Sequence, residues 1–321
     1  MGIRGSQLAG HTYTKKERDV MELIMQGLVN GIVIGAIYSL IAMGYNMIYS
    51  TTRVVNFAQG EFLMIGAIMS WLFQMRVGLP IWLSLLCVAI VCAAVGWLSE
   101  KLIMVPYKKS GAGYTWIITT MATAIAFRNF MTIPFGSESY SVSPIAVGRF
   151  ALGSAVMSYQ QLFVIGAMIV ILVSFELFTR YTFFGKAIRA AAFSTDITSL
   201  MGIPVSTIIS ISFILSSMIN GVAGALVAPL TFADANMGLS LGMKGFVCLV
   251  VGGLGSARGA VAGGLIIGIF EALVRSVLPT SMGNITIYIL LAIMLLIKPS
   301  GIFGGGNGGF RVWLGGLKKR T

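Results

Sequence analysis

Two breaks in long apolar stretches hold the residues best suited to bind a small solute. The first break runs from Arg53 to Glu61 and contains two amide side chains, Asn56 and Gln59. Amides donate and accept hydrogen bonds, and glycine permits unwound backbone. A helix beginning near Glu61 would direct its positive dipole end at a carboxylate. Binding of a zwitterion and a plain cytoplasmic loop are both open interpretations. The candidate solute-path residues here are Asn56, Phe57, Gln59, Gly60 and Glu61.

The second break, residues 252–259, is rich in glycine. Its glycines permit a sharp bend inside the membrane, and Ser256 can cap the next helix. A tight turn between two packed helices is the alternative. Paired interruptions in the two halves of a chain are typical of a transport site, although one pair does not prove a repeat. The candidate solute-path residues here are Gly252, Gly253, Gly255 and Ser256.

A basic island, residues 180–206, separates two long apolar stretches. It holds Lys186 and Arg189 in an alanine-rich segment that favours helix, and it ends in Gly202, Ile203 and Pro204. A chain that only crossed the membrane would need a turn there. Such an island is instead a place that a soluble motor domain could bind in order to move the neighbouring helices.

Charged residues also occur within or beside the apolar stretches. Glu176 and Arg180 are four residues apart, as are Glu271 and Arg275. Both pairs have the acid-before-base order that favours a helical ion pair, so structural pairing is one interpretation. The functional alternative is that Glu271 is a coupling carboxylate. Arg128 lies near a span end, where we expect it to snorkel to the interface.

Several catalytic classes are excluded by residues that the sequence lacks. The single histidine, His11, lies in the polar N-terminal segment, so neither a histidine-rich metal site nor a Ser/His/Asp triad can be assembled. Cys87, Cys92 and Cys248 lie in apolar stretches without a CxxC motif, which argues against a metal site. No P-loop motif is present. We therefore expect no enzyme, no bound metal and no ATP hydrolysis by this chain.

Composition predicts a membrane protein. Of 321 residues, 57% are hydrophobic and 10% are charged, whereas a soluble domain has about 25% charged residues. Apolar runs of about 20 residues recur, and backbone in lipid must be helical. The net charge is +12, and the basic residues lie between the apolar runs and at both termini. Membrane orientation and anionic lipid explain that charge better than nucleic acid does.

The expected architecture is an all-α bundle of about eight to ten spans with broken or re-entrant helices. Three parts are expected: a polar N-terminal tail (1–20), a transmembrane domain (21–300) and a Gly-rich basic tail (301–321). Glycines spaced by four, such as Gly27, Gly31 and Gly35, predict close helix packing. The expected spans are 27–49, 61–73, 81–100, 114–133, 161–179, 207–230, a glycine-broken pair at 245–253 and 259–278, and 285–297.

Orientation follows from the basic residues. With the basic island in the cytoplasm, alternation places residues 136–159 outside. The same parity sends Lys15–Arg18 outside, against the positive-inside rule.

The motifs above, with several others, occur in the order typical of one transporter family. The chain resembles the LivH-type permease subunits of bacterial branched-chain amino acid ABC importers. The matching segments are residues 27–31, 35–45, 48–49, 54–62, 184–190, 200–203, 252–256, 259–260, 263–264, 268, 271–273 and 298–304.

The resemblance implies a multi-pass subunit of the bacterial inner membrane that imports branched-chain or other aliphatic amino acids. Close variants carry urea or amides. The implied partners are a LivM-type permease or a second copy, two cytoplasmic ATPase subunits that hold ATP and Mg, a periplasmic binding protein and lipid. This chain itself would bind no cofactor and no nucleic acid. The residues implied in coupling to the ATPase are Gly185, Lys186, Arg189, Ala190, Ala191, Gly202 and Ile203.

An ion-coupled secondary carrier or channel for a small polar solute is the competing interpretation. It requires an ionisable carboxylate deep in the membrane, for which Glu61 and Glu271 are the candidates. A carrier has no need of the basic island, which therefore favours the importer.

Overall fold

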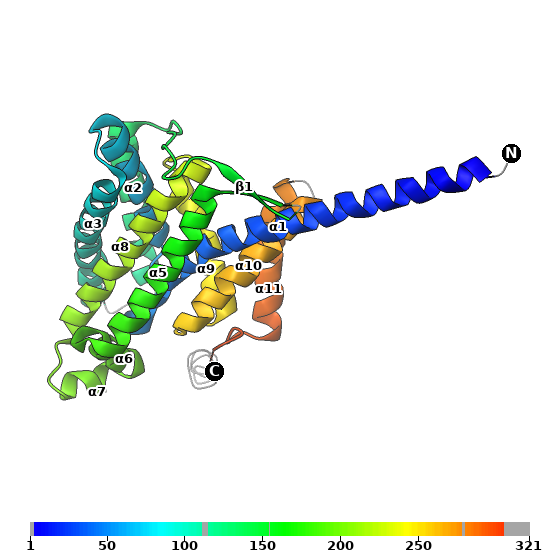
Figure 1. The fold of residues 1–321 in the computed structure, drawn as a ribbon. Helices are drawn as coiled ribbons and strands as arrows, with labels where there is room; N and C mark the ends of the chain where they lie inside the picture. The colour runs from blue at the N-terminus through cyan, green and yellow to red at the C-terminus, as the bar shows by residue number, and fades with distance from the viewer. Residues whose placement is uncertain (1–2, 111–114, 154, 278–279, 305–321) are drawn as a thin grey trace.

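The computed structural model describes residues 3–110, 115–153, 155–277 and 280–304, which form a helical bundle with one small β-hairpin (Figure 1). The elements in chain order are α1 (Ile3–Thr52), α2 (Gln59–Trp71), the π-helical turn η1 (Leu72–Arg76), α3 (Ile81–Ser110), α4 (Thr115–Phe135), β1 (Arg149–Leu152), β2 (Ala155–Ser158), α5 (Tyr159–Tyr181), α6 (Phe183–Phe193), α7 (Thr195–Leu200), α8 (Val205–Thr231), α9 (Met237–Gly252), α10 (Ala257–Val277) and α11 (Thr280–Ile297).

Within the described residues, five helices are long and apolar enough to cross a membrane: Met21–Thr52 of α1, Ile81–Met104 of α3, and all of α5, α8 and α10. Two shorter apolar helices, α9 and Met282–Ile297 of α11, accompany them. The chain is thus a multi-pass membrane protein, and the expected helical membrane bundle with broken helices is confirmed. α3 and α5 leave most of their surface outside the bundle, whereas α1 and α8 are largely buried within it.

The bundle is organised around the pairing of α1 with α10, which glycines bring into backbone contact. A Cβ atom built on Gly268 would lie 2.3 Å from the Cα of Gly35. One built on Gly31 would lie 2.7 Å from the Cα of Ile269, and one on Gly264 would lie 2.6 Å from the Cα of Ser39. The close packing predicted from the glycine spacing is confirmed. α1 also extends beyond the bundle at its N-terminal end (Figure 1).

The two ends of the bundle are marked by the hairpin and by α6. Near the start of the buried part of α1, the Gln26 amide donates to the carbonyl of Val156 in β2. At the other end of α1, Arg53 donates to the carbonyl of Ala192 in α6. α1 therefore runs from the hairpin end to the α6 end. If α6 lies in the cytoplasm, the N-terminal end of α1 lies outside, as the parity of the spans requires.

One expected boundary was wrong. α9 begins at Met237, eight residues before the expected span 245–253. The hydropathy signal there is weak because Gly238 and Gly242 replace larger apolar residues where α9 packs on Gly60. The connection 136–159 also contains the antiparallel hairpin, in which Arg149 pairs with Ser158.

We expect Gly268→Ala to destabilise the bundle by about 1–3 kcal/mol, the usual cost of overpacking a filled core. The added Cβ would meet the backbone of Gly35 on α1. Thermal unfolding of the purified protein in detergent measures the effect. The matched control is Gly166→Ala on α5, because nothing lies within 4 Å of a Cβ at that position. Equal unfolding midpoints for the two variants would contradict the proposed α1–α10 contact.

Candidate functional site

The first break is a buried, non-helical segment between α1 and α2. Arg53 ends α1 with a positive φ of 57°. Residues 54–58 then run without helix, and the Asn56 carboxamide oxygen accepts from the amide of Ala58 at 3.0 Å. The side chains of Asn56, Gln59 and Glu61 are almost completely buried. These three side chains are therefore not on an exposed loop, and Glu61 lies in the first turn of α2, as the loop alternative expected.

Gln59 connects α2 to two neighbouring helices through hydrogen bonds. Its Nε2 donates to the Ser216 hydroxyl at 2.7 Å, and that hydroxyl donates to the carbonyl of Gly44 at 2.7 Å. The Asn220 amide donates to the main-chain oxygen of Gln59 at 3.3 Å. The first turn of α2 is thereby fixed to α1 and α8 inside the bundle.

Several buried polar atoms around this break have no hydrogen-bond partner among the described residues. They are Gln59 Oε1, Asn220 Oδ1, Asn46 Oδ1, Glu61 Oε2 and Asn56 Nδ2. Leaving a buried polar atom unpaired costs about 1–3 kcal/mol, and in native proteins it often marks a functional position. The first break therefore keeps free hydrogen-bonding capacity, both donor and acceptor, inside the bundle.

Glu61 is neutralised by a cation from another helix. Its carboxylate, 1% exposed, lies 2.7 Å from the Arg128 guanidinium of α4. The expectation that Arg128 snorkels to the interface was wrong, because the arginine extends inward to the buried acid. No spacing along the sequence links the two residues, which are 67 positions apart.

The first turns of α2 and α9 are in direct backbone contact. A Cβ on Gly60 would lie 2.1 Å from the carbonyl oxygen of Gly238 and 2.9 Å from the Cα of Gly242. A Cβ on Gly238 would lie 2.8 Å from Glu61 Oε2. The N-terminal ends of two helices thus meet beside the Glu61 carboxylate, which their dipoles help to stabilise.

Phe57 forms an aromatic contact at the edge of the break. Its ring stacks on Trp116 of α4 with a centroid separation of 6.1 Å, and it lies 5.9 Å from the ring of Phe246 in α9. The half-buried Phe57 therefore supplies an apolar surface next to the polar residues.

The second break is a tight turn at the α6 end of the bundle. Gly253 and Gly255 have φ angles of 112° and 86°, which favour glycine. The Ser256 hydroxyl accepts from the amide of Gly259 at 3.0 Å, which confirms the predicted cap. The amide of Phe303 donates to the carbonyl of Gly252 at 2.9 Å. The tight-turn interpretation is thus correct for the backbone geometry.

The two breaks approach each other only at their outer ends. A Cβ on Gly255 would lie 3.6 Å from the Arg53 guanidinium. By contrast, the polar partners recorded for Gln59 and Glu61 come from α1, α4 and α8. The sequence therefore identified both breaks, but the structure does not bring their candidate residues together as one site.

A second buried charge cluster joins α1, α9 and α10. Glu271 Oε1 lies 2.6 Å from Lys244 and 2.5 Å from Arg275, and Oε2 accepts from the Tyr38 hydroxyl at 2.6 Å. The predicted Glu271–Arg275 pair is confirmed. The contributions of Lys244 and Tyr38 were missed, since Lys244 was assigned to a connection. Arg275 also donates to Asn284 of α11.

The basic island forms two short helices, α6 and α7, at one end of the bundle (Figure 1). The Thr182 hydroxyl caps α6, and the Ser194 hydroxyl caps α7. Gly185 allows α6 to contact α5 closely, because a Cβ there would lie 2.2 Å from the carbonyl oxygen of Phe178. Gly202 ends the pair with a φ of 78°.

α6 has a buried face and an exposed face. Ala187, Ile188 and Ala191 pack with Met47 of α1 and Ile208 of α8. Gly185 is buried as well, Ala190 and Ile203 are partly exposed, and Lys186, Arg189 and Gly202 are exposed. The exposed side also carries apolar side chains of α6, α7 and the following turn: Phe193, Ile197, Leu200 and Met201.

Comparison with known proteins bears directly on this arrangement. Residues 27–297 match the family model described as branched-chain amino acid transport system / permease component. The chain belongs to this permease family. The match covers both breaks, both charge clusters and α6–α7.

Individual relatives agree with the family match. The permease is 31% identical over 294 residues to the high-affinity branched-chain amino acid transport system permease protein LivH of Salmonella typhimurium, covering 87% of this chain and 95% of that protein. It is 30% identical to BraD of Pseudomonas aeruginosa, with the same coverage of both chains. Of solved structures, PsaBC from Streptococcus pneumoniae in complex with Fab has a TM-score of 0.47 at 14% identity, covering 88% of this chain and 94% of that one. The protein is accordingly a transport permease subunit of the ABC importer class and not an enzyme.

We expect Arg128→Met to destabilise the permease by about 3–5 kcal/mol, because it leaves Glu61 as an unpaired buried charge. The double variant Arg128→Met/Glu61→Gln should recover most of that loss, since no charge remains to be buried. Unfolding midpoints of the single and double variants in detergent measure the effect.

Lys244→Met is the matched control for this experiment. Its partner Glu271 keeps Arg275 at 2.5 Å, so a smaller loss is expected. A loss in Lys244→Met as large as that in Arg128→Met would contradict the account of Glu61, as would failure of the double variant to recover stability.

Proposed function

We propose that this permease forms half of the membrane path of an ATP-driven importer for branched-chain or other aliphatic amino acids in the bacterial inner membrane. Its partners would be a second permease, LivM-type or an identical copy, two cytoplasmic ATPase subunits and a periplasmic binding protein. ATP and Mg would be bound by the ATPases. Membership of the permease family supports this proposal, and so do the chemical features of two parts of the structure.

The exposed face of α6–α7 is the observation that carries the proposal. Phe193 is 85% exposed and Leu200 is 87% exposed, beside the exposed cations Lys186 and Arg189. An exposed apolar patch bordered by charge is typical of a protein interface. We assign it to the ATPase because α6 is in close contact with α5, α1 and α8, so that movement of a bound ATPase would reach the spanning helices.

The buried residues of α6 have a different role in this proposal. Gly185 and Ala191 lie against the bundle and so cannot contact an ATPase while α6 keeps this position. They would fix α6 to α5 and α1. Lys186, Arg189 and Gly202 would contact the ATPase directly, with Ala190 and Ile203 at the edge of the contact.

The first break supplies polar groups for the substrate path. A zwitterion crossing the membrane needs hydrogen-bond partners at depth, and broken helices supply them. Asn56 and Gln59 keep unpaired amide atoms there, next to the aromatic surface of Phe57. We propose that these groups contact the passing amino acid, and that the second break, Gly252–Ser256, borders the path at the α6 end.

The ion-coupled carrier is the weaker alternative because both candidate carboxylates are paired with cations. A coupling carboxylate must exchange its ion in each transport cycle. Glu61 is paired with Arg128, and Glu271 is held by Lys244 and Arg275. Each acid therefore already has a cationic partner from the protein in this arrangement.

We expect Arg189→Glu to reduce ATP-driven leucine uptake by about tenfold or more, since reversing a charge within an interface costs several kcal/mol. Uptake is measured with the complete importer in proteoliposomes loaded with ATP. Folding should be unaffected, because Arg189 is exposed.

The matched control is Lys298→Glu. Lys298 is also exposed, lies near the second break at the α6 end of the bundle, and forms no ion pair among the described residues, but it follows α11 and is not part of α6–α7. Normal leucine uptake by Arg189→Glu would contradict the role of α6–α7, as would an equal loss in Lys298→Glu. Uptake by the purified permease alone, driven by a proton or sodium gradient, would instead favour the carrier.

A further inference from the structure

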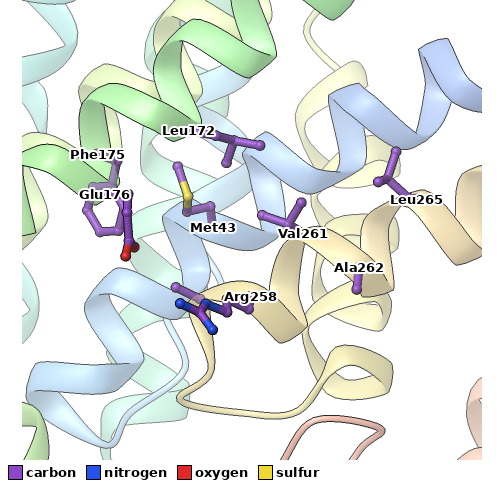
Figure 2. A pocket seen from close by; sticks show the side chains of 9 residues that line it. Met43, Leu172, Phe175, Glu176, Arg258, Val261, Ala262 and Leu265 are labelled. Carbon is purple, nitrogen blue, oxygen red and sulfur yellow. The ribbon is translucent and has the colours of Figure 1, made fainter.

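A groove of about 390 Å³ opens between α1, α5 and α10 (Figure 2). Leu172 and Phe175 of α5 form one wall, and Val261 and Leu265 of α10 form the other. Met43 of α1 lies between them. These five side chains give the groove an apolar interior of the size and chemistry that suit an aliphatic side chain.

One end of the groove carries two opposite charges. Glu176 of α5 and Arg258 of α10 both line it, and Figure 2 shows their side chains at the same end, with Leu172 and Leu265 farther along the groove. Within the described residues Arg258 has no ion pair, and Glu176 has only a 3.6 Å pair with Arg180. Both Glu176 and Arg180 are about half-exposed in that pair, so it adds little stability. The two groove charges can therefore accept new partners.

We propose that this groove binds the amino acid zwitterion when the permease faces the cytoplasm. The α-ammonium pairs with Glu176, the α-carboxylate pairs with Arg258, and the aliphatic side chain lies along Leu172, Val261 and Leu265. This inference rests on the proposed function and names a site on the inner part of its path.

The charge pattern favours a zwitterion over an anionic lipid. An anionic lipid could place its phosphate at Arg258 and an acyl chain in the groove, but Glu176 would then repel the phosphate. A free amino acid instead satisfies both charges at once. The order of its groups also matches the groove, because its charged groups would lie at the charged end and its aliphatic side chain along the apolar surface beyond.

The position of the groove connects it with both functional parts of the permease. Arg258 begins α10 directly after the second break, and Glu176 lies in the last turns of α5, which leads into α6. Because Gly185 of α6 is in contact with the backbone of Phe178 of α5, a shift of α6 moves the wall that carries Glu176. ATP-driven movement of α6 would therefore change the separation of the two charges and release the amino acid.

The first test fills the groove. We expect Ala262→Trp to lower the rate of leucine uptake by the complete importer about tenfold, because the indole occupies the volume that the substrate needs. Ala262 lines the groove. The matched control is Ile266→Trp on the same helix, an exposed position that does not line the groove. Equal uptake by the two variants would overturn the proposal.

The second test measures occupancy without relying on transport. Val261→Cys is placed in a Cys87→Ala background, since Cys92 and Cys248 are buried. Alkylation by N-ethylmaleimide is followed in the nucleotide-free complex, with leucine or with aspartate added. We expect leucine to slow alkylation about tenfold at saturation, and Arg258→Gln to abolish that protection while Arg258→Lys retains part of it.

The outcomes separate this inference from the proposed function. If wild-type importer takes up leucine but leucine does not protect Val261→Cys, the groove assignment is wrong and the proposed function stands. Protection by added anionic or zwitterionic lipid in place of leucine also overturns the assignment, because the groove is then a lipid site. If the wild-type importer takes up no leucine or other aliphatic amino acid, the proposed function itself is wrong.

Discussion

The contact between the first turns of α2 and α9 positions the first break and its buried polar groups. Gly60 and Gly242 have no side chain, so the two backbones lie closer together than a methyl group at either position would allow. Two helices can therefore begin inside the bundle, where the preceding segments supply partners for their first amides: the amide of Gln59 donates to the carbonyl of Asn56, and that of Met237 donates to the Asp234 carboxylate. The unwound segment before α2 follows directly from this arrangement. It brings Asn56, Gln59 and Glu61 to a depth that uninterrupted helices would line with apolar residues.

Burying charged groups costs free energy, and the two buried clusters neutralise their carboxylates in different ways. Glu61 has one cation, Arg128, so the pair is neutral. Glu271 has two, Lys244 and Arg275, so that cluster carries net positive charge. Both clusters join helices that are distant in the sequence, which makes them cross-links of the bundle. The buried polar atoms without a partner among the described residues lie at Gln59 and its neighbours. The charged groups available to a ligand, Glu176 and Arg258, lie in the groove beside α5.

The sequence predicted those features whose signal is local. The apolar runs, the glycine spacing of α1 and α10, the cap at Ser256 and the helical basic island all depend on residues within one or two turns of each other. Arg128 was predicted wrongly and Lys244 was missed because their roles depend on acids 67 and 27 residues away. The start of α9 was not predicted, because the glycines that let it pack closely on α2 also lower the hydropathy of that segment. The solute-path and coupling residues themselves remain predictions.

We infer that α5 and α6 move together against the body formed by α9 and α10 when the partner ATPases bind ATP. The most direct measurement is the distance between spin labels at Lys186→Cys on α6 and Leu254→Cys before α10, in the assembled importer with Cys87→Ala. We expect this distance to shift by about 2 Å or more between the nucleotide-free and ATP-trapped states, the scale of helix shifts at subunit interfaces. A reference pair at Leu254→Cys and Lys298→Cys, both in the body, should stay constant. An unchanged Lys186–Leu254 distance in a complex that still transports leucine would contradict the account.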